Sequence, residues 1–139
     1  MRKTVVATLL VFTTLFIAQT AFAAGAKLGF VDGDKVLREY PRFVAAQKQL
    51  AQTAERKEAA AHAAFDKEKD EAKKNKIVQN MQREMAQEEE KLMKPILKTV
   101  NDTVKKVAQQ KGVSVVVNKN LVYYGGIDLT ADVVSALKR

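Results

Sequence analysis

The 139-residue sequence has no cysteine and no tryptophan, and it has one histidine, two prolines and six glycines. Without cysteine, the chain forms no disulfide and carries no thiol nucleophile. The single histidine, His62, has no second histidine or cysteine with which to complete a zinc site, and no serine is predicted to lie near it. Glycine-rich phosphate-binding motifs are also absent from the sequence. The sequence therefore predicts no enzyme activity, no catalytic residue, no cofactor and no metal.

Residues 42–111 contain no glycine, and proline interrupts them only at Pro95. Strong helix formers, mainly Ala, Glu, Lys, Gln, Leu and Met, fill this stretch. Apolar residues recur at three- and four-residue steps in both of its halves, which is typical of amphipathic helices. The pattern predicts an antiparallel α-helical hairpin, a coiled-coil-like arm, with its turn near residues 73–77.

The position of the predicted turn determines which residues of the two helices face each other. A turn centred near Asn75 brings Val44 level with Val107, and Phe65 level with Met85. At 1.5 Å rise per residue, each limb would reach about 50 Å, which is too slender for a globular core. Proline in the second limb removes a helical hydrogen bond, so we expect a kink there.

The first 23 residues have the three parts of a secretory signal peptide. Arg2 and Lys3 form a basic start, residues 5–18 form a short apolar run, and the segment ends in Ala21-Phe22-Ala23. An uncleaved membrane anchor is the alternative, but a spanning helix needs about 20 apolar residues. We therefore expect residues 1–23 to be a signal peptide that is cleaved after Ala23.

The N-terminal part of the mature chain, residues 24–41, is expected to belong to a strand-rich body. Lys27–Asp32 alternates between apolar and other residues, as a strand does, and is followed by turn residues. Asp34 is a possible N-cap of a short helix. Pro41 then separates this helix from the long one, because the residue before proline avoids helical geometry.

The C-terminal part, residues 112–139, completes this body. Gly112 is expected to end the second long helix as its C′ residue. Residues 113–117 and 121–124 read as two antiparallel strands around a turn at 118–120. Thr130 is expected to cap a final helix. The predicted fold class is α+β: a long hairpin on a small strand body with a C-terminal helix.

A body of about 46 residues is near the size at which a chain needs oligomerisation to fold. Its strands cannot cover their own apolar faces. We therefore expect four residues to be buried at or near a subunit contact: Phe30, Val115, Val117 and Val122.

Methionine is flexible and polarizable, so a surface lined by it can accept many sequences. The candidate residues for binding other proteins are Phe65, Met81, Met85, Met93 and Leu97. Met81 and Met85 have an alternative role, which is to join the two helices of the hairpin. Met93 and Leu97 lie off the main apolar stripe and are the better candidates for exposure.

Positive charge gathers near the base of the arm. Residues 94–119 carry six lysines and one aspartate, whereas residues 77–93 carry two basic residues and four glutamates. One interpretation is that the excess of lysine attracts acidic proteins or an anionic membrane surface. The other is that it serves only for solubility. Nucleic acid is a poor third interpretation, because no set of stacking aromatic residues accompanies the lysines.

Segments along the whole mature chain, taken in order, carry a family resemblance. They are Lys27–Asp32, Lys35–Pro41, Lys94–Leu97, Gly112–Asn118, and Ile127–Thr130 with Val133 and Leu137. In their order and spacing they resemble the Skp/OmpH family of periplasmic outer-membrane-protein chaperones. The resemblance implies a periplasmic homotrimer with a shared β-barrel body and three helical arms around a cavity. It also implies that unfolded outer-membrane proteins are held in that cavity, without nucleotide and without catalysis.

The sequence thus favours an ATP-independent periplasmic holdase that binds unfolded outer-membrane β-barrel proteins before their insertion. Its expected partners are those clients and two further copies of itself, with possible peripheral contact to an anionic membrane or to lipopolysaccharide. The alternative is a structural coiled-coil adaptor of the cell envelope that recognises one folded partner.

Overall fold

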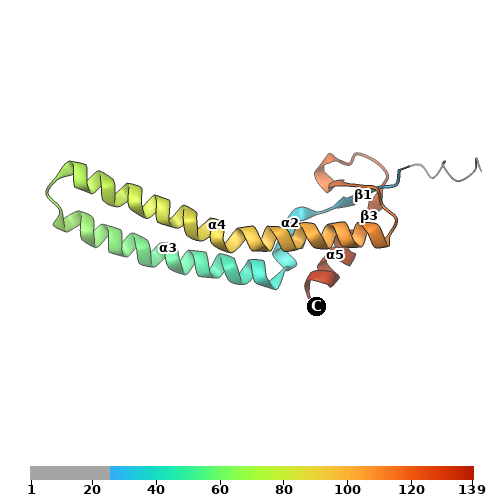
Figure 1. Ribbon diagram of the computed structural model, residues 1–139, viewed down its shortest axis with the longest axis horizontal. Coiled ribbons are helices and arrows are strands. Elements are labelled where there is room, and N and C mark those ends of the chain that lie inside the picture. Colours follow the sequence, from blue (N-terminus) through green and yellow to red (C-terminus); the bar gives the residue numbers. More distant parts are fainter. Residues whose placement is uncertain (1–25) are drawn as a thin grey trace, which may run out of the picture.

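A computed structural model describes residues 26–139. The predicted signal peptide and its cleavage site lie outside the described residues. Two long helices, α3 (Pro41–Lys67) and α4 (Glu71–Gln110), run side by side away from a small body (Figure 1). The body consists of β1 (Leu28–Val31), α2 (Gly33–Glu39), β2 (Val115–Asn118), the 3-10 helix η2 (Lys119–Leu121), β3 (Ile127–Asp128) and α5 (Thr130–Leu137). The chain is mostly helical with one small sheet, in agreement with the predicted α+β class.

The turn of the hairpin lies at residues 68–70, because α3 ends at Lys67 and α4 begins at Glu71. The prediction of a turn near 73–77 is therefore wrong. As a result the two helices differ in length, with 27 residues in α3 and 40 in α4.

Two carboxylates explain why the chain turns where it does. The side chain of Asp70 accepts hydrogen bonds from the backbone N–H groups of Ala72 and Lys73, at 2.8 and 3.2 Å. The side chain of Glu68 accepts from the N–H groups of Lys69 and Asp70, at 2.9 and 3.0 Å. The bonds to Asp70 satisfy donors that the start of α4 leaves without partners, and the bonds to Glu68 hold the turn before it. Lysine side chains have no acceptor, so the lysines at 73–76 continue α4 instead of ending it.

The earlier turn changes the register of the arm. Lys57 of α3 meets Glu84 of α4 at 2.5 Å, and nearer the body Ala46 packs with Ile96. The predicted pairing of Val44 with Val107 is therefore wrong, as is that of Phe65 with Met85.

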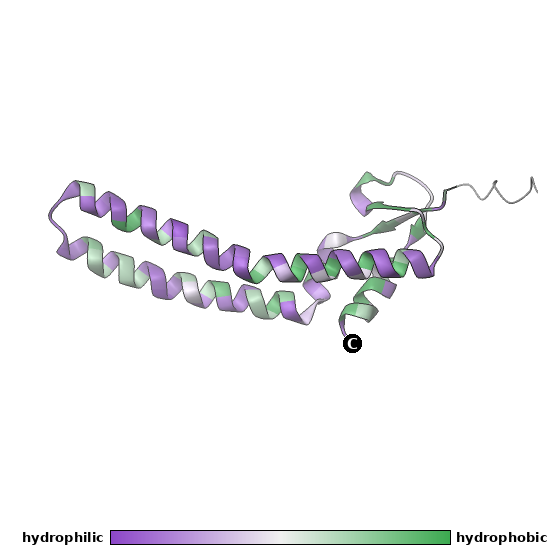
Figure 2. Ribbon diagram, in the orientation of Figure 1, coloured by the Kyte–Doolittle hydropathy of each residue, from purple (hydrophilic) through white to green (hydrophobic). Residues whose placement is uncertain are grey.

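The C-terminal turns of α4 extend past the start of α3 and belong to the body. Val107 and Ala108 are buried there. The buried core that they join consists of Val31, Val36, Val113, Leu129, Val133 and Val134. Figure 2 shows hydrophilic residues over most of the arm, whereas hydrophobic residues recur on this end of α4 and on α5. A second, smaller buried cluster of Tyr40, Ala46 and Ile96 lies at the base of the arm.

The sheet has three strands in the order β2-β1-β3, and both pairings are parallel. In the register of the sheet, Leu28 lies opposite Val115, Phe30 opposite Val117, and Gly29 opposite Ile127. The long hairpin is thus a crossover connection between β1 and β2, as parallel neighbours require.

The predicted antiparallel strand at residues 121–124 is wrong. The side chain of Asn118 accepts a hydrogen bond from the N–H of Asn120 at 3.0 Å, which turns the chain into η2 rather than into a hairpin. Gly125 and Gly126 then have φ angles of 78° and 94°, a conformation that favours glycine. The chain therefore crosses β1 and pairs on its other edge.

The end of α4 matches the prediction. Gly112 has a φ angle of 65°, and its N–H bonds to the carbonyl of Gln109 at 3.2 Å. The N–H of Val113 bonds to the carbonyl of Ala108 at 2.9 Å. This pair of bonds is a Schellman motif, and it places Val113 in the core beside Ala108.

Two predicted caps are corrected. Asp32, not Asp34, caps α2, because its side chain accepts from the N–H of Lys35 at 2.9 Å. Thr130 makes no cap bond to α5. It is buried instead, with its hydroxyl accepting from the N–H of Asp32 at 3.0 Å and its own N–H donating to Asp128 at 2.9 Å. These bonds tie the end of β1 to the start of α5.

Candidate functional site

The arm has almost no interior. None of residues 47–95 is buried, although this range includes most of α3 and more than half of α4. A contact between two helices can cover only one side of each, and α3 adds a run of alanines that gives little bulk. The apolar residues of the arm therefore line open hollows instead of a core.

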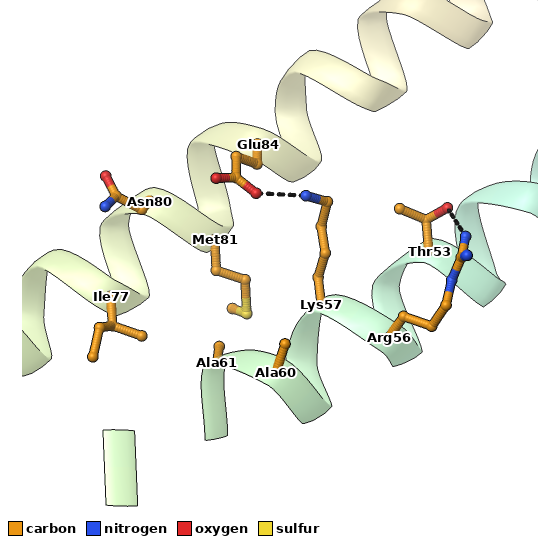
Figure 3. Close-up of a pocket in the computed structure, with 9 residues that line it drawn as sticks. All are labelled: Thr53, Arg56, Lys57, Ala60, Ala61, Ile77, Asn80, Met81 and Glu84. Carbon is orange, nitrogen blue, oxygen red and sulfur yellow. Dashed lines mark hydrogen bonds and ion pairs between the residues drawn. The ribbon is translucent and has the colours of Figure 1, made fainter. Parts of the chain in front are cut away.

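One hollow lies between α3 and α4 and has a volume of about 520 Å³ (Figure 3). It is lined by Thr53, Arg56, Lys57, Ala60, Ala61, Ile77, Asn80, Met81 and Glu84. Figure 3 shows Met81 pointing from α4 toward Ala60 and Ala61, while Lys57 and Glu84 bridge the two helices beside it. The hydrogen bond from Lys57 lowers the pKa of Glu84. The floor of this hollow is thus apolar and its edge is charged.

A second hollow, of about 450 Å³, lies nearer the tip of the arm. It is lined by Glu58, Ala61, His62, Phe65, Asp66, Val78 and Met81. Phe65 and Val78 are each 37% exposed. The ammonium group of Lys74 lies 5.0 Å from the centre of the Phe65 ring, which is a cation–π contact.

A third hollow, of about 740 Å³, is the largest of the three and is lined by α4 alone. Its residues are Ala86, Glu89, Glu90, Met93, Lys94, Leu97, Lys98, Asn101 and Asp102. Leu97 is 46% exposed, and Met93 is half-buried against the cluster at the base of the arm.

Four of the five candidate binding residues fall into two places. Phe65 and Met81 share the hollow near the tip, and Met93 and Leu97 share the hollow on α4. Met85 is half-buried and lines none of the three hollows. Val78, which sequence reasoning did not single out, completes the apolar floor near the tip. Val78 comes opposite Phe65 because the hairpin turns at residues 68–70 and not near 73–77.

The four candidate contact residues lie in the body. Phe30, Val115 and Val117 share one face of the sheet, because paired residues of parallel strands point the same way and alternate residues share a face. This outer face is turned away from the buried core, and Val115 is 48% exposed. Val122 is half-buried in the loop after η2, not in a strand.

Tyr123 and Tyr124 follow that loop residue with fully exposed rings, yet the sequence reasoning passed over them. Two adjacent aromatic residues in a segment expected to be a strand were the available signal. Their exposure adds apolar surface to the body.

Charge pairs surround the body. Lys119 lies 3.4 Å from Asp32, and Lys138 lies 2.9 Å from Glu39. The backbone N–H of Lys35, followed by Lys119, lowers the pKa of Asp32. The hydrogen bond from Lys138 lowers the pKa of Glu39.

Asp128 is a third carboxylate of the body with a lowered pKa. Hydrogen bonds from the Thr130 side chain and then from its backbone N–H are the main causes. Each of these three carboxylates of the body either links segments that are far apart in the sequence or accepts a hydrogen bond at the start of a helix.

The lysines near the base of the arm are largely paired. Lys94, Lys98, Lys111 and Lys119 lie within 3.4 Å of a carboxylate, on Glu90, Asp102, Asp132 and Asp32 respectively. Within residues 26–139, Lys105 and Lys106 form no ion pair. The positive surplus predicted from the sequence is therefore offset locally at four of its six positions.

His62 lies on the exposed surface of the arm, 3.5 Å from Asp66. The part of the chain that the structure describes contains no group of three or more His, Cys, Asp or Glu residues placed to hold a metal ion. No helix among residues 26–139 combines the length and hydrophobicity needed to cross a membrane.

Comparison with known protein families identifies the chain. Residues 54–137 match the family described as "Outer membrane protein (OmpH-like)". The chain belongs to the OmpH-like family. The match covers the outer part of α3, all of α4, and the C-terminal half of the body from β2 through α5, and it begins after β1 and α2. No curated protein matches the sequence.

Membership of the OmpH-like family supports a chaperone-type role in the periplasm, and not the role of an enzyme, at the level of the family. It also supports an oligomeric protein that binds outer-membrane proteins. The resemblance noted in the sequence is thus confirmed at this level.

Proposed function

We propose that this protein is an ATP-independent periplasmic holdase, which binds unfolded outer-membrane β-barrel proteins between its helical arms and prevents their aggregation. The observation that carries the proposal is the arm, where no residue between 47 and 95 is buried. Phe65, Met81 and Met93 in this range, and Leu97 just beyond it, line open hollows. A surface of this kind offers adaptable apolar contacts without a fixed shape.

The proposed assembly is a homotrimer with a shared barrel. The uncovered outer face of the sheet supports it, since Phe30, Val115 and Val117 would otherwise remain in contact with water. Both edges of the three-stranded sheet also lack a neighbouring strand among residues 26–139. Three arms that extend from one such body would surround a common space.

The test of the holdase is to measure aggregation of several denatured porins with the mature protein and with an arm-truncated variant. The variant lacks residues 54–88, which removes nearly equal lengths of α3 and α4, and a short turn joins the remaining ends. We expect the mature protein to keep porins soluble, and the variant to assemble normally but to lose that activity. A truncated protein that still kept porins soluble would show that residues 54–88 of the arm are not the binding element.

The same assay separates the holdase from a coiled-coil adaptor. A holdase suppresses aggregation of unrelated unfolded porins and ignores the folded ones. Binding of one folded envelope protein, together with no effect on denatured porins, would overturn the holdase and establish the adaptor.

The proposed assembly is tested by Val115→Asp, which puts a charge on the outer face of the sheet. We expect sedimentation to show loss of the trimer at low micromolar concentration. Ala131→Asp is the matched control, because Ala131 is exposed in the first turn of α5, where an acidic residue is tolerated. A trimer that survives Val115→Asp would contradict the proposed contact.

Contact with an anionic membrane or with lipopolysaccharide is a weaker part of the proposal. Lys105 and Lys106 support it, as exposed lysines on the surface of α4. Flotation with anionic vesicles, compared between the mature protein and Lys105→Gln/Lys106→Gln, tests this contact.

A further inference from the structure

The hollow on α4 is lined by one helix alone and lies along a side of it that faces away from α3. All nine of its lining residues belong to α4, whereas a straight helix presents a convex surface on every side. Figure 1 shows α4 changing direction part-way along its length, with the concave side turned away from α3. The hollow therefore lies on the concave side of the bend.

Three residues at four-residue spacing account for the bend. Pro95 lies inside α4 and has no N–H, so one helical hydrogen bond is missing at this point. The hydroxyl of Thr99 donates to the carbonyl of Pro95 at 2.9 Å, and the hydroxyl of Thr103 donates to that of Thr99 at 2.7 Å. Bonds of this kind from threonine to the preceding turn also bend helices.

The residues that bend α4 and the hollow lie on opposite sides of the helix. Pro95 and Thr99 face α3, where they line a separate hollow with Ala45 and other residues. Met93 is two positions before Pro95, which at 3.6 residues per turn is about 200° around the helix. A helix bends away from the side on which its proline lies, so the opposite side is the concave one.

The charges around the hollow indicate the chemistry of its occupant. Lys94 is paired with Glu90 at 3.3 Å, and Lys98 with Asp102 at 2.6 Å. With Glu89, the rim has three carboxylates and two lysines, so its net charge is −1 and it offers no excess of positive charge for an anionic ligand. The centre is apolar, through Met93 and Leu97. Its volume of about 740 Å³ lies in the range of about 300–1,000 Å³ that is usual for binding pockets.

We propose that Pro95, Thr99 and Thr103 are positioning residues, which bend α4 so that Met93 and Leu97 form a concave seat for apolar side chains of an unfolded polypeptide. The inference rests on the proposed holdase function and deepens it. Capture at this seat is mainly hydrophobic and depends weakly on salt, because four of the five rim charges are already paired with one another.

The bend is tested by a distance within α4. The chain has no cysteine, so spin labels attach only at Gln79→Cys and Lys105→Cys, two exposed positions outside the hollow. A straight helix would place the two backbone positions about 39 Å apart at 1.5 Å per residue. Excess unlabelled protein ensures that only distances within one chain are measured. We expect a shorter distance in the native sequence and a longer one after Pro95→Ala/Thr99→Val/Thr103→Val, with Pro95→Ala alone between them.

The role of the bend in capture is tested by binding of a denatured porin. We expect the straightened variant, and separately Met93→Ser/Leu97→Ser, to weaken binding by about three- to tenfold at both low and high salt. Gln82→Ser/Gln87→Ser is the matched control, because both glutamines are exposed on α4 outside the hollow. Circular dichroism and sedimentation establish that each variant is folded and assembled.

The outcomes separate the inference from the function on which it rests. A distance unchanged by the three substitutions, or a straightened arm that binds porin normally, would overturn the positioning role while the holdase stands. Normal binding by Met93→Ser/Leu97→Ser would overturn the seat. If the native protein bound no denatured porin, the holdase itself would fail, and the distance measurement would still decide the cause of the bend.

Discussion

The body and the arm of this protein are built in opposite ways. In the body, Val36, Leu129 and Val133 are completely buried, and helices and strands from both ends of the chain contribute to one core. In the arm, no residue between 47 and 95 is buried. α4 takes part in both, because its C-terminal turns pack in the body and the rest lies in the arm. One helix can therefore form part of a buried core or part of an open arm, depending on how many of its sides are covered by neighbouring elements.

Because of this difference, the body should determine the stability of the fold, whereas the arm is free to bind other proteins. Burial of apolar side chains is the main source of folding free energy, so the body must hold the fold. The arm contributes little burial and opens at low cost, as regions with few buried contacts do. Changes in the two regions should consequently have different effects, and four experiments can break or sharpen the comparison.

The largest effect is expected in the core of the body. Leu129→Ala removes a completely buried side chain and should lower the free energy of unfolding by about 2–5 kcal/mol. Val78→Ala is the control in the arm, where a partly exposed residue should change it by about 0.5 kcal/mol or less. Urea unfolding of both variants measures the contrast. Equal losses would mean that the arm and the body do not differ in this way.

A glycine of the body should be nearly as sensitive. A Cβ atom at Gly29 would lie 2.9 Å from Val113 Cγ1 and 3.1 Å from Leu129 Cδ1, so Gly29→Ala overpacks the core and should cost about 1–3 kcal/mol. At Gly33 a Cβ would meet only the Asn118 side-chain amide, at 3.3 Å. Thermal unfolding of Gly33→Ala should show a smaller shift, and a larger one would contradict this account of the core.

Acid should weaken the body. The pKa values of Asp32, Glu39 and Asp128 are lowered in the folded protein from ordinary values of 3.8, 4.5 and 3.8. Each carboxylate therefore stabilises the fold above its ordinary pKa, and this contribution is lost as the pH falls through the lowered value. Unfolding midpoints measured from about pH 6 to about pH 3 should fall mainly below pH 4.5. Asp32→Asn/Glu39→Gln should reduce this dependence, and an unchanged profile would count against these pairs.

The smallest effect is expected at the ion pair of the arm. Lys57 and Glu84 are 28% and 53% exposed, and exposed pairs contribute little to stability because both charges stay solvated. A double-mutant cycle of Lys57→Ala and Glu84→Ala, with hydrogen exchange of α3 as its readout, should give a small coupling that decreases with salt. A coupling as large as the Leu129→Ala effect would show that the arm is held more rigidly than its burial indicates.

Local signals in the sequence determined much of this protein. The helix formers of residues 42–111, the break at Pro41 and the glycine at 112 predict the long helices and two of their ends correctly. Each of these depends on residues within a few positions of one another. The same holds for Lys27–Asp32, where alternation alone predicts β1.

Tertiary structure decided what local signals left open. The sequence alone favoured lysines over the Glu68 and Asp70 carboxylates for the turn, and an error of a few residues there changed every pairing across the arm. Residues 121–124 have the composition of a strand, yet Asn118 turns the chain before they can pair. Thr130 satisfies the N–H of Asp32 instead of its own helix, because folding brings two distant segments together. The α4 hollow likewise depends on how Pro95, Thr99 and Thr103 act together on one helix, since a bend depends on which side loses its hydrogen bonds.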